Sequence, residues 1–491
     1  MAIKMANKYF FIILWVFALL FVAVLYSANL YFGELNQDEG WYLYAARMVH
    51  SGKLPYIDFA TTQGPVMPFI YALADPLIVK YGLAGGRFFT AVIGFFTSIL
   101  TAFLAMRLSS VLRKHTAFLA FVFVAINVYQ NYYFTVVKTY SLTAFFIVLS
   151  FLFLSFAGKR YRIIFPFLAG ITCAIAACTR ISAVLIVPAV VIYFFLRKEE
   201  RDICSIISFI AGFVISLCSV LFPFFLYNRE SLWFALWEYH TKREVASLVG
   251  CLAYKGAFIS RQVQAYFLVV SLFVCTVVFW LFRRRKMQYS IWKSKLDIAL
   301  WLSVVFVSIA HLAAPFPYDD YQVIIYPLFS AIVASTVIRL LYGLSNQEEA
   351  GQVTGVICIV FFIVAIMSSL SSPINQEWFA AKRDRIWWPL KTETPLRKLQ
   401  KVAALVKTLT SPQEEILTQD PYLAVEANRK IPHGLELGQF SYFPNWPRDK
   451  CEKCHVLNHE MFMELINGTS ASLAAFSEYG FAIKSPGIIP L

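Results

Sequence analysis

The chain has 491 residues, of which 59% are hydrophobic and only 15% charged, and its mean hydropathy is +0.64. This composition excludes an ordinary soluble domain and is typical of a protein that crosses the membrane several times. The formal net charge of +14 does not indicate nucleic-acid binding, because the cations cluster in short segments between the apolar stretches.

Eleven apolar segments are long enough to predict membrane spans, so the expected fold class is an α-helical polytopic membrane protein. They cover residues 10–32, 87–106, 116–134, 139–157, 162–178, 181–196, 203–227, 262–282, 297–314, 321–341 and 352–372. The first segment is too long for a signal peptide and has no small-residue cleavage site, so we interpret it as a retained anchor.

The basic residues between the spans predict the orientation of the chain. Lys4 and Lys8 precede the first span, and Lys-Arg clusters follow alternate spans at residues 113–114, 159–162, 197–198 and 283–286. The positive-inside rule therefore predicts a cytoplasmic N-terminus and an extracytoplasmic C-terminal segment. It also places the loop of residues 33–86 outside.

Two adjacent carboxylates, Asp38 and Glu39, stand directly behind the first span in the segment Asn36-Gln37-Asp38-Glu39-Gly40-Trp41-Tyr42. Such a pair can act as a general base or hold a divalent cation such as Mg²⁺ or Mn²⁺. The structural alternative is capping, because the periodicity predicts an amphipathic helix over residues 40–50 with Asp38 as its N-cap and Glu39 in the first turn. Both roles can coexist, since a capping carboxylate is well oriented.

The residues around this pair resemble a known signature. It comprises Asp38-Glu39-Gly40-Trp41-Tyr42-Leu43-Tyr44-Ala45-Ala46-Arg47, Ser51-Gly52-Lys53-Leu54-Pro55-Tyr56-Ile57-Asp58-Phe59, Gln63-Gly64-Pro65 and Pro68. This run is similar to the first external loop of the polytopic GT-C glycosyltransferases, which include protein O-mannosyltransferases and lipid A aminoarabinose transferases. The local match covers residues 36–110. The loop departs from the commonest form, which has a Lys after the Asp where this chain has Phe59-Ala60-Thr61-Thr62-Gln63.

The resemblance implies a glycosyltransferase that takes a sugar from a polyprenyl-phosphate carrier and passes it to a glycan, lipid or protein at the outer face of the membrane. Asp38 would be the catalytic base and Glu39 its neighbour. The resemblance favours direct displacement with inversion. A retaining route would need a second carboxylate about 5 Å away, a position that Asp58 could fill. Asp58 could equally begin the turn after Pro55-Tyr56.

A phosphate donor needs cations that offset the charge of the leaving group. The predicted external segments offer five candidates: Lys138, Arg180, His240, Lys242 and Arg243. Arg180 is the preferred one, because it sits between two short spans with little loop to carry it into water. For each candidate the alternative is an interfacial cation that reaches the lipid headgroups.

The predicted span interiors hold almost no ionisable side chains, with His311 at an outer end as the nearest exception. Ion-coupled transporters usually carry such groups at membrane depth, so an enzyme is favoured over the alternative, a lipid or polysaccharide transporter. Asp319 and Asp320 could be metal ligands, but a role at the start of a helix is the simpler interpretation.

The chain divides on hydropathy into a membrane domain of residues 1–372 and an extracytoplasmic domain of residues 373–491. Helices are predicted over residues 396–409, 422–430 and 455–466, and a strand over residues 415–418, which together indicate a small α/β domain.

One motif in this domain has several interpretations. The segment Cys451-Glu452-Lys453-Cys454-His455 matches the haem-attachment pattern, and with His459 it gives a set of zinc type. A haem site would make the chain a redox protein. A local disulfide in an oxidising compartment is the simplest alternative.

Overall fold

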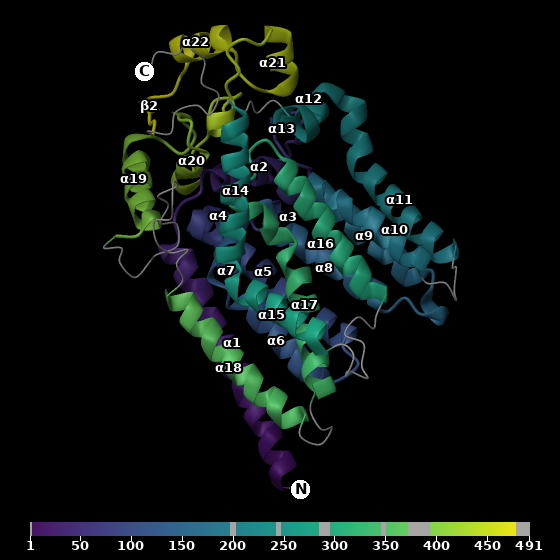
Figure 1. The fold of residues 1–491 in the computed structure, drawn as a ribbon. Helices are drawn as coiled ribbons and strands as arrows, with labels where there is room; N and C mark the ends of the chain where they lie inside the picture. The colour runs from purple at the N-terminus through teal and green to yellow at the C-terminus, as the bar shows by residue number, and fades with distance from the viewer. Residues whose placement is uncertain are drawn as a thin grey trace.

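The computed structural model describes residues 2–196, 203–241, 247–283, 295–344, 350–371 and 393–477. Figure 1 shows a long helical bundle with the N-terminus at its lower end and the C-terminal elements gathered above its upper end. We call this upper end, which carries α2 (Gln37–His50), the α2 end of the bundle.

Within the described parts of the chain, six helices are long and apolar enough to cross a membrane: α1 (Ala2–Phe32), α5 (Leu83–Leu108), α11 (Ile203–Tyr227), α16 (Lys295–Ala313), α17 (Tyr326–Leu344) and α18 (Ala350–Ser371). Three shorter apolar helical segments accompany them, in α8 (Thr139–Ser155), α9 (Ile164–Thr179) and η2–α10 (Ile181–Leu185 and Ile186–Leu196). In addition, α14 (Leu248–Ala265) and α15 (Phe267–Arg283) form a pair bent by 87°. The polytopic α-helical fold class is confirmed, whereas the count of eleven spans stays a prediction.

The predicted span of residues 116–134 is broken in the structure. Helix α6 (Arg113–Ala125) ends before Asn127, and α7 (Val128–Tyr133) begins after it. The Asn127 side chain accepts a hydrogen bond from Gln130 N at 2.8 Å, so it caps the new helix and stabilises the break. The chain then leads from α7 to Lys138 at the start of α8.

Two arginines are buried inside the bundle, which corrects the expectation of nearly uncharged spans. Arg339 on α17 pairs with Asp297 on α16 at 2.7 Å and also donates to Leu108 O. Arg87 on α5 pairs with Glu39 at 2.6 Å. A charge in an apolar interior is tolerated only when it is paired and hydrogen-bonded, and both arginines meet that condition.

Short elements complete the α2 end. They are α3 (Val66–Ala72), α4 (Asp75–Tyr81), α12 (Arg229–Trp233), the π-helix η4 (Phe234–Glu238), α13 (Tyr239–Thr241) and η5 (Asp319–Ile324); η1 (Lys159–Tyr161) lies between α8 and α9. The C-terminal elements are α19 (Pro395–Leu409), β1 (Ile416–Leu417), α20 (Pro421–Ala427), η8 (Gly438–Phe440), α21 (Arg448–Cys454), α22 (His459–Gly468) and β2 (Leu473–Ala474). The two strands form a parallel pair.

The predicted C-terminal helices and strand are present with shifted bounds, since α20 ends at Ala427 rather than at residue 430 and α22 begins later than predicted. Helix α22 begins at His459 rather than at residue 455, because Asn458 caps it by accepting from Met461 N at 2.8 Å. His455 instead ends α21 with a left-handed φ of 56°.

The C-terminal elements share one hydrophobic cluster with α2 and α3. Leu43 and Tyr71 from the first loop lie in the same buried cluster as Leu423 and Val425 of α20. The Tyr44 hydroxyl also accepts a hydrogen bond from Ile431 N at 2.9 Å. The predicted domain division at residue 372 is not tested by this contact, but the C-terminal elements have no core separate from α2.

Gly40 provides a test of this packing. A Cβ at Gly40 would lie 2.2 Å from Tyr422 N, and backbone atoms cannot yield as side chains do. We expect Gly40→Ala to separate α2 from α20 and to lower stability by about 1–3 kcal/mol. Thermal unfolding in detergent measures the effect. Gly256→Ala is the matched control, because a Cβ there meets no atom within 4 Å; equal melting temperatures for the two variants would contradict the close packing.

Candidate active site

The start of α2 is fixed by a capping box, but its members differ from the predicted ones. Asn36 is the N-cap, and its side chain accepts from Asp38 N at 3.1 Å. Glu39 closes the box by accepting from Asn36 N at 3.0 Å. Asp38 is therefore not the cap, and its carboxylate is available for other partners.

Glu39 is fully buried and bound on both oxygens. Arg87 donates to it from Nε at 2.8 Å and from Nη2 at 2.6 Å, and Val137 N donates at 3.2 Å. Arg87 further donates to the carbonyl oxygens of Leu30, Gly33 and Glu34. This geometry makes Glu39 a positioning residue that ties α2 to α5 and to the chain before α8, rather than a partner of Asp38 in chemistry.

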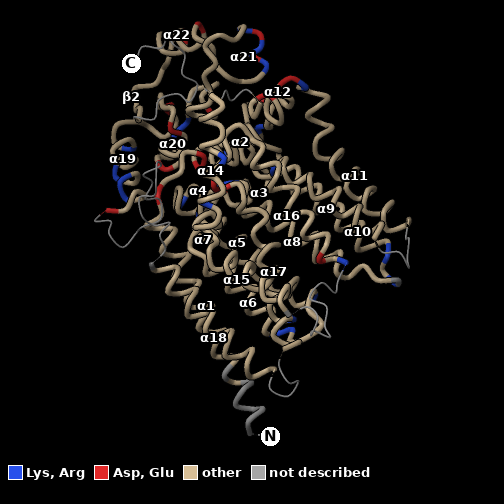
Figure 2. The backbone as a smooth tube through the Cα atoms, viewed as in Figure 1, with Lys and Arg blue, Asp and Glu red and all other residues tan. Residues whose placement is uncertain are grey.

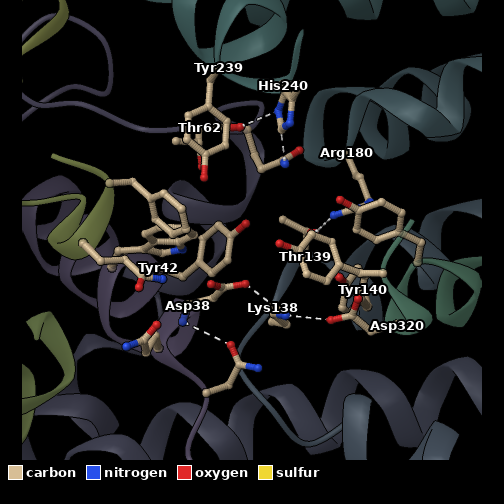
Figure 3. A pocket seen from close by; sticks show the side chains of 18 of the residues that line it. Asp38, Tyr42, Thr62, Lys138, Thr139, Tyr140, Arg180, Tyr239, His240 and Asp320 are labelled. Carbon is tan, nitrogen blue, oxygen red and sulfur yellow. Dashed lines mark hydrogen bonds and ion pairs between the residues drawn. The ribbon is translucent and has the colours of Figure 1, made fainter. Parts of the chain in front are cut away.

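A pocket of about 510 Å³ opens beside the first turn of α2. Asp38 lines it with a side chain that is 25% exposed, and Lys138 lies between Asp38 and Asp320 (Figure 3). The Lys138 ammonium is 3.0 Å from Asp38 Oδ2 and 2.7 Å from Asp320 Oδ2. Burial lowers the pKa of Lys138, but the carboxylates of Asp320 and Asp38 outweigh burial and hold the pKa well above its usual range. Lys138 therefore stays charged.

Arg180 is the second cation in the pocket. It follows α9 and donates from Nη1 to Thr139 Oγ1 at 3.3 Å. Its guanidinium carbon lies 4.8 Å from the ring centres of both Tyr140 and Tyr321. The buried Nε has no hydrogen-bond partner among the described residues. A buried donor without a partner is costly, so an anion or hydroxyl bound here would relieve that cost.

His240 lies across the pocket from Lys138 (Figure 3). Its Nε2 is 3.0 Å from Thr62 O and 3.5 Å from Gln63 Nε2, so it is tied to the loop that follows Asp58. Tyr42 and Tyr140 also line the pocket. The resulting wall combines aromatic faces with hydroxyl, amide and imidazole groups, a mixture that suits a polar organic ligand.

An apolar groove of about 330 Å³ lies next to the pocket, on the other side of η5. Asp320 and Tyr321 of η5 line the pocket, whereas the next residue, Gln322, lines the groove. The rest of the groove is contributed mainly by apolar side chains of α14, α15, α16 and α17, including Phe258, Val263, Val304 and Phe329. One short helix thus separates a charged pocket from an apolar one.

The charged residues are distributed unevenly along the bundle. Figure 2 shows acidic and basic residues together at the α2 end and basic residues in loops at the lower end of the bundle, with few charges along the helices between them. The pocket is therefore placed where the polar chemistry of the described chain is concentrated.

Among the predicted site residues that the structure describes, Glu39 and Asp58 do not line the pocket. Asp58 lies outside it, in a turn where its carboxylate accepts from Leu54 N at 2.7 Å. The turn role considered for Asp58 is thus the observed one. Lys242 and Arg243 lie outside the described residues.

Asp320 is the main residue whose role the sequence did not indicate. It does begin η5, as predicted, but it also holds Lys138 across 182 residues of chain. The neighbouring Asp319 pairs with Arg261 instead, with 3.6 Å between Asp319 Oδ1 and Arg261 Nη1. Gln439 and Phe440 of η8 line the pocket too, and no local signal places C-terminal residues beside Asp38.

The Cys451-Cys454-His455 motif has a packing role in the structure. Both cysteines are buried in the cluster shared with α2, and burial raises the pKa of Cys451 to about 11. His455 Nε2 contacts Tyr56 O at 3.2 Å, while His459 Nδ1 contacts the Tyr442 hydroxyl at 3.0 Å. No group of three or more His, Cys, Asp or Glu residues in the described chain is arranged to hold a metal ion. These contacts give no support to a haem or zinc site.

Sequence comparison yields little beyond one distant relative. No family model matches the chain. A protein of Aquifex aeolicus (strain VF5), described as uncharacterized, is 24% identical over 364 residues, which are 71% of this chain and 67% of the relative.

Comparison of structures is more informative. ArnT from Cupriavidus metallidurans in the apo state has a TM-score of 0.61 at 13% identity, covering 94% of this chain and 92% of ArnT. The same protein bound to undecaprenyl phosphate has a TM-score of 0.62 at 10% identity, covering 94% and 93%. The Archaeoglobus fulgidus oligosaccharyltransferase in complex with Zn and sulfate reaches 0.50 at 14% identity, covering 89% of this chain and 67% of that one. ArnT, an aminoarabinose transferase, and the oligosaccharyltransferase are both GT-C superfamily members. The chain therefore has the GT-C fold, as the resemblance in its first loop predicts.

Proposed function

We propose that this protein is a membrane glycosyltransferase that moves a sugar from a polyprenyl-phosphate donor to a nucleophilic acceptor, with Asp38 as general base. The observation that carries the proposal is the pocket in which Asp38, Lys138 and Arg180 meet beside an apolar groove. A lipid-linked sugar phosphate has the same division, with an apolar tail and an anionic head. The ArnT structure bound to undecaprenyl phosphate supports this donor class through a shared fold.

Asp38 is the carboxylate suited to accept a proton. Glu39 is occupied by Arg87, and Asp320 is almost completely buried against Lys138. Asp38 remains partly exposed to the pocket and is held in place by Lys138 and by the first turn of α2. A fixed carboxylate within reach of an acceptor hydroxyl or amine is the geometry that general-base catalysis needs.

The cations that line the pocket suit the leaving group. Arg180 can bind a phosphate oxygen through its Nε, which has no hydrogen-bond partner among the described residues, and Lys138 adds a second positive charge. Their charge offsets the negative charge that develops on the phosphate as the glycosidic bond breaks. The groove beyond η5 would then receive the first isoprene units of the carrier.

The proposed reaction is a single displacement at the anomeric carbon. The acceptor oxygen or nitrogen attacks the anomeric carbon while its proton passes to Asp38, and the bond from that carbon to the phosphate oxygen breaks. The electron pair leaves with the polyprenyl phosphate, toward Arg180. One displacement inverts the anomeric centre. Asp58 lies in a turn outside the pocket, and Asp320 is held by Lys138, so neither is offered as the nucleophile of a retaining route.

The distribution of cations supports a site at the outer face. In Figure 2, basic residues of the described chain lie in loops at the end of the bundle opposite the pocket, the side that the positive-inside rule predicts to be cytoplasmic. We therefore propose that the donor is used on the extracytoplasmic side, with the C-terminal elements above it.

Substitution of the base tests the proposal directly. We expect Asp38→Asn to reduce kcat by about 10²–10⁴-fold, because the amide cannot accept the proton. The measurement is sugar transfer by purified protein from a panel of radiolabelled polyprenyl-phosphate sugars. Asp58→Asn is the control and should keep most of the activity. Wild-type turnover that survives Asp38→Asn would contradict the assignment.

Arg180 gives a second prediction. We expect Arg180→Gln to lower kcat/KM by about 10²-fold, since an amide provides hydrogen bonds but no charge for the leaving phosphate. Arg180→Lys should recover part of the loss. The effect should shrink for a donor whose leaving group is less basic. Equal rates for the Gln and Lys variants would argue against an electrostatic role.

Lys138 leads to a prediction about metal ions. Its ammonium already lies between Asp38 and Asp320, where a divalent cation bridging the two carboxylates would otherwise sit. We expect turnover to be unchanged by excess EDTA and unstimulated by Mg²⁺ or Mn²⁺. We expect Lys138→Ala to lose activity and to acquire stimulation by these ions, because two carboxylates would then face an empty site. Loss of wild-type activity on EDTA treatment would show that a metal is needed.

A further inference from the structure

Helix α19 has two apolar faces, of which only one is packed against other described residues. Leu396, Leu399, Ala403 and Val406 are buried in the cluster shared with α2. Val402, Leu405 and Leu409 form a second apolar stripe with exposed fractions of 48%, 58% and 56%. Their spacing of three and four residues puts them on one side of the helix. We call these three residues the apolar stripe.

The charges on α19 are of one sign. Its sequence carries four cations and no acidic residue. Lys398 and Lys401 lie four residues before Val402 and Leu405, so they lie on the same side of the helix as the apolar stripe. Lys401 has one acidic neighbour, Glu393, at 2.5 Å, which leaves the helix with a net positive charge. In Figure 2 basic residues are seen on the tube of α19, at the left side of the molecule.

The position of α19 relates this surface to the bilayer. The helix contacts α1, and its first turns share a cavity with Glu34 and Leu35, the residues that directly follow α1. Since α1 is a candidate membrane span, α19 lies at the level where the chain leaves the bilayer. Figure 1 shows α19 on the outer side of the bundle, above α1.

We propose that α19 is an interfacial helix that docks on the membrane surface, with the apolar stripe at the acyl-headgroup boundary and Lys398 and Lys401 against anionic lipid headgroups. A helix with exposed apolar residues beside cations has the composition of such elements. The attraction of each cation to an anionic leaflet strengthens binding about fivefold. The helix would thereby anchor the C-terminal elements over the pocket. This inference does not depend on the proposed reaction.

Photo-cross-linking of the full-length protein tests the docking. Benzoylphenylalanine is placed at Leu405 in the apolar stripe or at Ala404, which is exposed on the polar side of α19. The protein is held in nanodiscs of phosphatidylglycerol and phosphatidylcholine in equal amounts, and adducts are identified by mass spectrometry. We expect several-fold more lipid adduct from position 405 than from position 404. Equal lipid adducts at the two positions, or adducts to protein only, would overturn the proposal.

The lipid identity of the adducts tests the charge. In the wild-type background, phosphatidylglycerol should exceed phosphatidylcholine several-fold among adducts from position 405. Lys398→Gln with Lys401→Gln should bring this ratio back to the bulk composition, whereas Lys407→Gln, on the polar side, should leave it unchanged. A wild-type ratio equal to the bulk would show that anionic headgroups are not recognised. Thermal unfolding of each variant identifies any loss of folding separately.

Discussion

The buried pair of Glu39 and Arg87 is the contact on which the site depends. Both side chains have no exposed surface, and the carboxylate also binds the backbone at the start of α2 and before α8. Removal of one partner would leave an unpaired charge in the interior, at a cost of about 3–5 kcal/mol. Because the same pair fixes α2, α5 and the approach to Lys138, it also fixes the distance between Asp38 and its ammonium partner. Glu39 therefore holds the backbone segments that position Asp38 and Lys138.

The residues that line the pocket come from distant regions of the chain. Asp38 comes from the first loop, Lys138 from the start of α8, Arg180 from the turn after α9 and Asp320 from η5. Each of these residues lies at a helix end, where the chain emerges from the bundle and its side chains are free to converge. The apolar groove behind η5 is instead lined by side chains along the lengths of the helices. A single short helix thus separates a charged pocket from an apolar groove.

Sequence patterns predicted the parts of the structure that local rules control. Apolar length located the helices, and the segment around Asp38, together with the isolated position of Arg180, located two members of the pocket. Local rules do not predict which residues pair when they are far apart in the sequence. Asn36 rather than Asp38 caps α2, because Glu39 completes a capping box with Asn36. Asp320 was assigned to a helix start, since only the fold brings it to Lys138. Buried Arg87 and Arg339 stand inside apolar helices because distant carboxylates neutralise them.

The shared core of α2 and the C-terminal elements has a consequence for biosynthesis. Leu43 and Tyr44 leave the ribosome early, whereas their packing partners in α20 and η8 follow almost 400 residues later. Contacts so far apart in sequence form slowly, and the early surface stays uncovered during translation. Gln439 and Phe440 also complete the wall of the pocket. A chain that stalls after α18 would lack these two residues, so the wall of its pocket would be incomplete and the proposed activity would require the C-terminal elements.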